Sequence, residues 1–287
     1  MSPKGCLEGQ PRSGTRRFYP AHMKDILKTG RFLIPYRIYE SKGPHIVCIN
    51  GVQQSMAMWL TFVSRFAGKY RIVLFDFPNQ GRAGIVSGSS KVALDEQVQI
   101  LRTVLDETQV SRDATLCAAS WGGVVAVALA AKYPDRIRRL ILASLGTKPN
   151  KKMVETIKKG SLIDIKDRDL MARTLLEGFG EDLPSGIKQK IVDQFRTMKE
   201  ENVRAFYEHG LFVLASKNLS DLVNLKKIRA KTILLNGRND KIIDLEDVKF
   251  LASLIPDCEM RIVEGVGHFL HMEREDVVDI YEDILQG

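Results

Sequence analysis

Residues 115–123 read TLCAASWGG, an apolar segment that ends in a serine flanked by small residues. An Ala- and Val-rich stretch typical of a helix follows directly. This order predicts a buried strand, a sharp turn at Ser120 and a helix, an arrangement called a nucleophile elbow, in which the serine hydroxyl projects from the top of a sheet. Gly122 meets the need for a small residue two positions after the serine. Ala118 stands where a glycine usually precedes it, so the G-x-S-x-G pattern is matched in part.

Short apolar runs alternate with helical stretches along most of the 287-residue chain. The runs at residues 46–49 and 233–235 are continuously apolar, which is typical of strands that are buried on both faces. The alternation predicts an α/β fold with a mostly parallel central sheet flanked by helices. The strand candidates are residues 31–40, 45–50, 71–77, 114–119, 138–144, 231–236 and 258–264.

The strand pattern is interrupted in the second half of the chain by helical spacing. Ile187, Ile191 and Phe195 recur at intervals of four residues, which predicts an inserted helical cap. Most of its apolar stripes are expected to pack against the main domain, while its Leu, Met and Phe content suits an aliphatic or acyl group. The expected division is a poorly ordered, Pro- and Gly-rich leader at 1–24, a core at 25–147 and 226–287, and the cap at 148–225.

A serine hydroxyl is a weak nucleophile until a base takes its proton, and that base needs a third group to hold it. His268 is the candidate base, because it lies in a Gly-marked loop after the last strand candidate. Asp240 follows a buried strand and is the candidate acid. Asp244 lies in the same loop, but it is expected to cap the next helix, with Asp247 at the third helical position. Nucleophile, acid and base then occur in the chain order of α/β hydrolases.

Acyl transfer through a serine also requires two N–H donors for the developing oxyanion, and losing one typically costs about 3 kcal/mol of transition-state stabilisation. The Trp121 N–H is the first candidate, because this residue directly follows the serine. The Val52 N–H is the second, because it follows Asn50 and Gly51 at the end of a strand candidate. The alternative is that Asn50-Gly51 forms only a turn.

Three further polar residues lie near these motifs. Asp76 ends another buried strand and is expected to cap backbone N–H groups rather than to perform chemistry. His271 stands three residues after His268, which in isolation suggests a metal pair, but no Cys/His cluster completes a site. His209 lies in the expected cap, where it is either structural or in contact with substrate. No nucleotide, flavin or metal motif is present, so no cofactor and no metal are predicted.

Charge and cysteine usage narrow the cellular setting. The four cysteines form no C-x-x-C pair, no apolar run approaches the length of a membrane span, and the N-terminus lacks the apolar core of a secretory signal, so a cytoplasmic protein is expected. The formal charge of +8 favours an acidic partner. The basic residues are scattered without the signature of a nucleic-acid module, so the partner considered is an acidic acyl carrier protein and not a nucleic acid.

Taken together, these motifs resemble the α/β hydrolase fold from about Arg31 to the C-terminus. More narrowly, the chain resembles the 3-hydroxyacyl acyltransferases, which include the 3-(3-hydroxyalkanoyloxy)alkanoate synthase of rhamnolipid formation and the 3-hydroxyacyl carrier-protein thioesterase or transacylase. The resemblance implies that Ser120 is the nucleophile, Asp240 the acid and His268 the base. The matching pieces are ING at 49–51, VLFDFP at 73–78, ASWGG at 119–123, NGRND at 236–240 and GHFL at 267–270.

The leading hypothesis is that Ser120 attacks a 3-hydroxyacyl thioester, that His268 accepts its proton, and that an acceptor relieves the acyl-enzyme. The triad does not choose among acceptors, since water gives a thioesterase, a second hydroxyacyl group an ester-linked dimer, and a thiol a transacylase. One alternative is a general carboxylesterase that acts on small-molecule esters with the same triad. Another is a non-catalytic ligand-binding protein that retains the fold.

Overall fold

The computed structural model describes residues 22–216 and 218–287, with side chains from residue 25 onward. The expected leader at 1–24 therefore lies almost entirely outside the described residues. These residues form one nine-stranded sheet in the order β1-β2-β4-β3-β6-β7-β8-β9, with β5 paired to β2. Neighbouring strands from β4 to β9 in this order run parallel, as the alternation of strands and helices predicts. Their bounds are Arg71–Phe75 for β4, His45–Ile49 for β3, Thr115–Ala119 for β6, Arg139–Ala143 for β7, Lys231–Gly237 for β8 and Cys258–Val263 for β9.

One edge of the sheet is antiparallel. The strands β1 (His22–Thr29) and β2 (Phe32–Tyr39) form a hairpin, and β2 also pairs with β4 and with the two-residue strand β5 (Gly84–Ile85). Neither β1 nor β5 is among the strands expected from the sequence. The segment DILKT of β1 has a polar composition, and β5 is too short to show any period. Only pairing with β2 makes them strands.

Two apolar layers fill the space on the two faces of the sheet, because successive strand residues point to opposite sides. Val47, Leu116 and Leu234 face one layer, which helices α2 (Leu94–Glu107), α3 (Trp121–Lys132) and α9 (Leu245–Leu254) complete. Cys48 and Cys117 face the other layer, which α1 (Leu60–Phe66) and α10 (Val277–Gln286) complete. Strands β3 and β8 are buried on both faces, as their continuous apolar runs predict.

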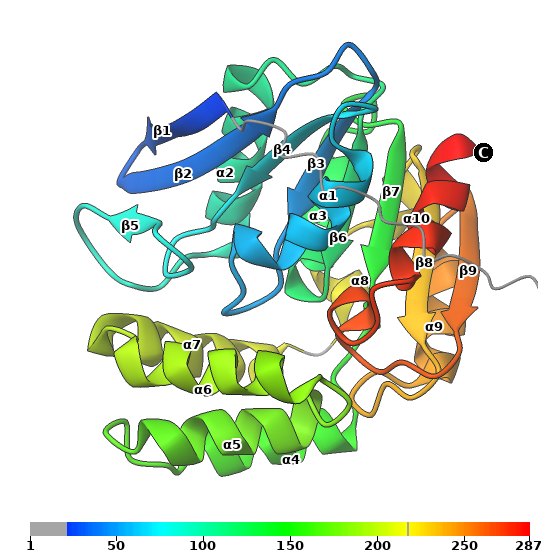
Figure 1. The fold of residues 1–287 in the computed structure, drawn as a ribbon. Coiled ribbons are helices and arrows are strands. Elements are labelled where there is room, and N and C mark those ends of the chain that lie inside the picture. The colour runs from blue at the N-terminus through cyan, green and yellow to red at the C-terminus, as the bar shows by residue number, and fades with distance from the viewer. Residues whose placement is uncertain (1–21, 217) are drawn as a thin grey trace, which may run out of the picture.

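A group of helices is inserted between β7 and β8, and most of them lie beyond the carboxyl ends of the parallel strands (Figure 1). These inserted helices have a small apolar core of their own, in which Met171, Ala172, Phe195 and Val203 are the buried members. Within the described residues, none of the helices is long and apolar enough to cross a membrane. The inserted helices are α4 (Lys151–Ser161), α5 (Arg168–Phe179), α6 (Ser185–Thr197), α7 (Glu200–Ala215) and α8 (Leu219–Leu222).

The first inserted helix is tied to the core by two aspartates that the sequence assigned to a helix cap. Asp244 is the N-cap residue of α9 by position, but its side chain makes no cap hydrogen bond. It accepts a hydrogen bond of 2.8 Å from the Nδ2 of Asn150 instead. Asp247 accepts the backbone N–H of Thr147 at 2.6 Å. The expected local cap is thus replaced by contacts between segments about 95 residues apart in the chain, which anchor the start of the insertion.

Candidate active site

Ser120 occupies a strained turn between β6 and α3. Its φ of 48° and ψ of −120° lie in a region that residues with a side chain rarely adopt. The turn is held because the Ser120 N–H donates to the Ala143 carbonyl at 2.8 Å and the Gly123 N–H donates to the Ser120 carbonyl at 2.8 Å. A Cβ at Gly122 would lie 2.5 Å from the Asn50 carbonyl oxygen, so only glycine fits there. Ala118 is buried in the core, 1% exposed, and its methyl group is accommodated.

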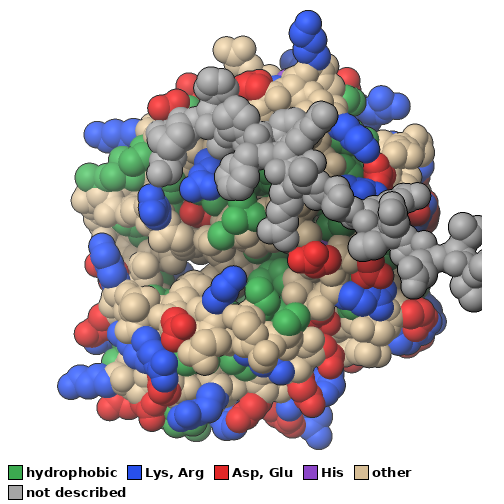
Figure 2. Space-filling model, viewed as in Figure 1, with side chains coloured by type: hydrophobic (Ala, Val, Ile, Leu, Met, Phe, Trp, Pro, Cys, Tyr) green, Lys and Arg blue, Asp and Glu red, His purple; other side chains and the backbone are tan. Residues whose placement is uncertain are grey.

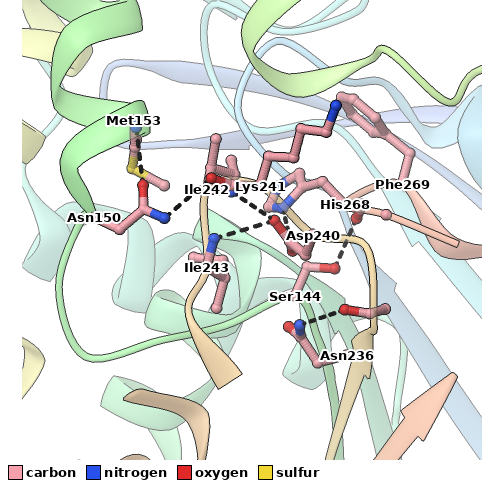
Figure 3. A network of polar contacts seen from close by, with 12 residues as sticks. Ser144, Asn150, Met153, Asn236, Asp240, Lys241, Ile242, Ile243, His268 and Phe269 are labelled. Carbon is pink, nitrogen blue, oxygen red and sulfur yellow. Dashed lines mark hydrogen bonds and ion pairs between the residues drawn. The ribbon is translucent and has the colours of Figure 1, made fainter. Parts of the chain in front are cut away.

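His268 and Asp240 meet beyond the ends of β9 and β8 (Figure 3). The Nδ1 of His268 lies 2.9 Å from the Oδ2 of Asp240, and both side chains are almost fully buried. The other carboxylate oxygen, Oδ1, accepts the backbone N–H groups of Ile242 at 3.0 Å and Ile243 at 3.1 Å. Because a carboxylate only accepts hydrogen bonds, the ring donates from Nδ1 and its Nε2 is left to take a proton. Asp244, the rival acid, is bonded to Asn150 and not to this ring.

Ser120 and His268 line the same cavity of about 940 Å³, which lies between the core and the inserted helices. Among the described residues, the Ser120 hydroxyl makes no hydrogen bond to the imidazole; catalytic hydrogen bonds are often long before substrate binds. Most of the remaining wall is aliphatic or aromatic. Its apolar members from the inserted helices include Met153, Ile157, Met171, Leu175, Phe179, Ile187, Ile191, Phe195 and Phe206.

Val52 and Trp121, the expected oxyanion donors, line this cavity beside Ser120. Within the described part of the chain, neither of their backbone N–H groups donates to another backbone group. The loop that carries Val52 is a tight turn, in which the Gln54 N–H donates to the Gly51 carbonyl at 3.3 Å and Gln53 has a φ of 57°. The alternative of a turn at Asn50-Gly51 therefore also describes this loop, in which Val52 lines the cavity.

The side chain of Asn50 organises the floor beneath this loop, a role that the sequence did not reveal. Its Nδ2 donates to the Phe75 carbonyl at 3.1 Å and to the Oδ1 of Asp76 at 3.0 Å, and its Oδ1 accepts the indole N–H of Trp59 at 3.0 Å. Asn50 is 1% exposed and thereby joins the ends of β3 and β4. Trp59 was not singled out, because no local pattern connects it to a residue nine positions away.

Asp76 accepts backbone N–H groups, as expected from its position after β4. The Met56 N–H donates to its Oδ1 at 2.6 Å, and the Arg82 N–H lies 3.5 Å from its Oδ2. Burial raises the pKa of Asp76 from 3.8 to about 6, although its hydrogen-bond donors oppose the shift. The carboxyl group therefore supports the segment after the loop that carries Val52, and it does not line the cavity that Ser120 and His268 share.

Of the two other histidines near the site, His271 is buried and His209 is half-buried, and both are uncharged at neutral pH. His271 contacts the Met58 carbonyl through Nε2 at 3.2 Å and packs on Trp59, and burial lowers its pKa to about 4. His209, on α7, packs edge to face with Trp121 at a ring distance of 4.4 Å and lines the cavity. Its pKa is also lowered to about 4 by burial. Residues 22–216 and 218–287 contain no group of three or more side chains suited to a metal ion.

Comparison of the sequence with known proteins identifies the family and several distant relatives. The model of the "Alpha/beta hydrolase family" matches residues 46–280. The (R)-3-hydroxydecanoyl-ACP:CoA transacylase of Pseudomonas aeruginosa is 22% identical over 241 residues, which cover 84% of this chain and 80% of that protein. A monoacylglycerol lipase of Homo sapiens is 25% identical over 260 residues, covering 85% of this chain and 75% of the lipase.

Solved structures show the same fold at low identity. An alpha/beta hydrolase enzyme from a Medee basin deep-sea metagenome library superposes with a TM-score of 0.78 at 18% identity. The match covers 92% of this chain and 98% of that one. The nine-stranded sheet with helices on both faces is therefore an α/β hydrolase fold.

Proposed function

The chain belongs to the alpha/beta hydrolase family, and we propose that it is a serine-dependent enzyme of acyl transfer or hydrolysis that acts on 3-hydroxyacyl thioesters. The observation that carries the proposal is the arrangement at the cavity floor. The strained Ser120 and His268 line one cavity, and Asp240 is buried against the imidazole of His268. Among the described residues, the backbone N–H groups of Val52 and Trp121, which line the same cavity, have no backbone partner. This set supplies a nucleophile, a base, an orienting acid and two oxyanion donors.

In the proposed reaction the Ser120 Oγ forms a bond to the thioester carbonyl carbon while its proton passes to the Nε2 of His268. The carbonyl oxygen becomes an oxyanion that accepts hydrogen bonds from the N–H groups of Val52 and Trp121. When the carbonyl re-forms, the carbon–sulfur bond breaks and the thiolate takes the proton from His268. The acyl-enzyme then reacts with an acceptor by the same steps in reverse, with His268 deprotonating the incoming group.

Three observations support the acyl class and the carrier. The largely apolar wall of the 940 Å³ cavity suits an aliphatic chain. A curated relative is named as a 3-hydroxydecanoyl transacylase, at 22% identity. Helix α4, which lines the cavity, carries the exposed residues Lys151, Lys152, Lys158 and Lys159, of which Lys151 pairs with Glu155 and Lys159 with Glu177. This basic surface suits an acidic acyl carrier protein. On the face shown in Figure 2, basic and acidic side chains are mixed, and a hollow separates the inserted helices from the core.

The test is to offer the protein 3-hydroxydecanoyl thioesters of carrier protein and of CoA beside p-nitrophenyl esters, and to identify the products by mass. We expect thioester turnover, labelling of Ser120 by a fluorophosphonate, and loss of both in Ser120→Ala. Turnover of the carrier-bound substrate should fall as salt rises, because screening weakens attraction between opposite charges. The proposal fails if Ser120 is not labelled, an outcome that would favour a non-catalytic ligand-binding protein.

A general carboxylesterase is the second candidate. The same aliphatic wall suits an ester with a long acyl chain, and another relative is named as a monoacylglycerol lipase, at 25% identity. Turnover of p-nitrophenyl or glycerol esters at least about tenfold faster than of either thioester would favour this candidate.

A further inference from the structure

The loop that carries His268 lies between β9 and α10, and side chains rather than strand pairing hold its backbone. The Gly267 N–H donates to the Oε2 of Glu273 at 2.5 Å. The Phe269 N–H donates to the other oxygen, Oε1, at 2.8 Å. One carboxylate thus binds the backbone N–H groups on both sides of His268.

A second side chain holds the backbone of His268 itself. The Ser144 hydroxyl donates to the His268 carbonyl at 2.7 Å (Figure 3). Ser144 follows β7, is 2% exposed, and has a φ of 54° in the left-handed region. Its own N–H donates to the Leu235 carbonyl at 2.9 Å, which fixes it to β8. A non-glycine residue held in this conformation indicates that its surroundings over-determine its place.

We propose that Glu273 and Ser144 are positioning residues that hold His268 in register with Ser120, and that the Glu273 carboxylate also stabilises the imidazolium formed during the reaction. This inference rests on the proposed role of His268 as the base. Asp240 orients the ring through Nδ1, whereas Glu273 and Ser144 restrain the backbone from which the ring projects. Together the three side chains fix both ends of the residue.

The charges around the loop are mostly acidic. Asp240 contacts the ring, and Asp182, from the segment between α5 and α6, approaches Gly267 beside Glu273. A Cβ at Gly267 would lie 3.1 Å from Asp182 Oδ2 and 3.2 Å from Glu273 Oε1. Burial and, to a smaller degree, Asp182 raise the pKa of Glu273, while its two N–H donors and His268 oppose this.

Two cations beside the loop are engaged. Lys241 pairs with Glu181, and Arg274 donates to the Glu264 carbonyl at 2.9 Å and pairs with Asp276 at 2.6 Å. Glu275, which is exposed, lines the cavity, and so do Lys148 and Lys190. Asp240 contacts the His268 ring and Glu273 the flanking backbone, so a neutral residue in place of Glu273 should weaken the stabilisation of a positive charge on this ring.

The experiment compares the pH dependence of kcat/KM for wild type, Glu273→Gln, Glu273→Asp and Ser144→Ala. A glutamine has one acceptor oxygen and cannot bind both N–H groups, since its amide nitrogen would face a donor. We expect Glu273→Gln to lower kcat about 10- to 100-fold and to move the acid limb to lower pH. Ser144→Ala should lower kcat about tenfold and leave the acid limb in place, because it removes a hydrogen bond but no charge.

Glu273→Asp keeps the charge on a shorter side chain, so its acid limb should stay near that of wild type while kcat falls. The matched control is Asp283→Asn, which removes an exposed carboxylate on α10 whose side chain makes no hydrogen bond or ion pair among the described residues; its profile should match wild type. Melting curves show whether each variant is folded.

Two outcomes separate this inference from the proposed function. If fluorophosphonate labels Ser120 and labelling depends on His268, but Glu273→Gln and Ser144→Ala behave like Asp283→Asn, the positioning role is wrong and the function stands. If wild-type Ser120 is not labelled, the proposed function itself fails. An unchanged acid limb in Glu273→Gln overturns the electrostatic part alone.

Discussion

The loops at the carboxyl ends of the parallel strands and the inserted helices form opposite walls of one cavity, and the two walls differ in how their side chains are held. On the core side, polar side chains such as Asn50 and Asp240 are buried and bonded to groups on neighbouring strands or loops. On the other side, α4 has no buried residue, and the inserted helices share a core with only four buried members among the described residues. The groups that we propose to react are thus tightly restrained, while the shape of the proposed acyl site depends on a lightly packed layer that can vary without moving them.

The largest expected effect tests the core side. Asp240→Asn should lower kcat about 10³- to 10⁴-fold, because an amide in place of the carboxylate favours the wrong imidazole tautomer and cannot stabilise its cation. The measurement is single-turnover release of product from a thioester. Asp244→Asn, four residues along and bonded to Asn150, is the control and should stay within a factor of about three. Equal losses in the two variants would show that the acid is misassigned.

A smaller effect tests whether Asp76, which lies beside Asn50 at the end of β4, is as buried as its contacts indicate. The pKa of Asp76 is raised in the folded state, so the shift stabilises the fold below pH 4 and this contribution is lost as pH rises through about 6. Asp76→Asn retains an acceptor for Asn50 and Met56 but does not ionise. The free energy of unfolding of wild type relative to the variant should therefore fall by up to about 3 kcal/mol between pH 4 and pH 7.

Urea unfolding of both proteins across this pH range measures the difference. The pKa values of His209 and His271 are lowered in the folded state, so they add stability that is lost as pH falls toward 4. This opposite trend is the same in wild type and in Asp76→Asn. It therefore cancels when the free energy of unfolding of the variant is subtracted from that of wild type. A pH-independent difference would contradict a buried, ionisable Asp76.

The smallest expected effect tests the inserted helices. Ile187 lies on α6 and lines the cavity, so Ile187→Trp should shorten the space for an acyl chain. We expect preference to shift toward shorter chains by about 10- to 100-fold in kcat/KM, since each methylene in an apolar pocket is worth roughly 1–3 kcal/mol. Fluorophosphonate labelling of Ser120 should keep its wild-type rate. The control is Leu162→Trp, at a side chain that is 88% exposed; a loss of labelling in Ile187→Trp alone would show that the two walls are coupled.

Agreement between sequence and structure was best where the signal is local. A buried strand, a serine and a glycine within nine residues predicted the turn at Ser120, because backbone sterics and strand burial act over that distance. The parallel strands were also predicted from local signals, because each is a short apolar run and helical stretches alternate with these runs. The hairpin strand β1 and the short strand β5 were missed, since only their partner β2 makes them strands.

The helix-cap prediction at Asp244 shows the limit of local rules. A cap residue was correctly placed, but its side chain turned to Asn150, 94 residues away. A short polar side chain chooses among partners of similar strength, and the nearest partner in space is decided by packing. The role of Asn50 depends in the same way on Trp59 and on the adjacent residues Phe75 and Asp76, which come from two other segments.

The sequence by itself determined the fold class and the types of residue that the proposed chemistry needs. The reason is that the hydrophobic period, the chain order of the motifs and the residues of a strained turn can all be identified in short stretches of sequence. Only the tertiary structure decided which carboxylate reaches His268 and which backbone N–H groups lack a backbone partner among the described residues. It also decided that Glu273 and Ser144 bind the backbone of the loop that carries His268. The physical reason is that a hydrogen bond is specified within a few tenths of an ångström. Such distances between remote segments arise only when the sheet and its helices pack together.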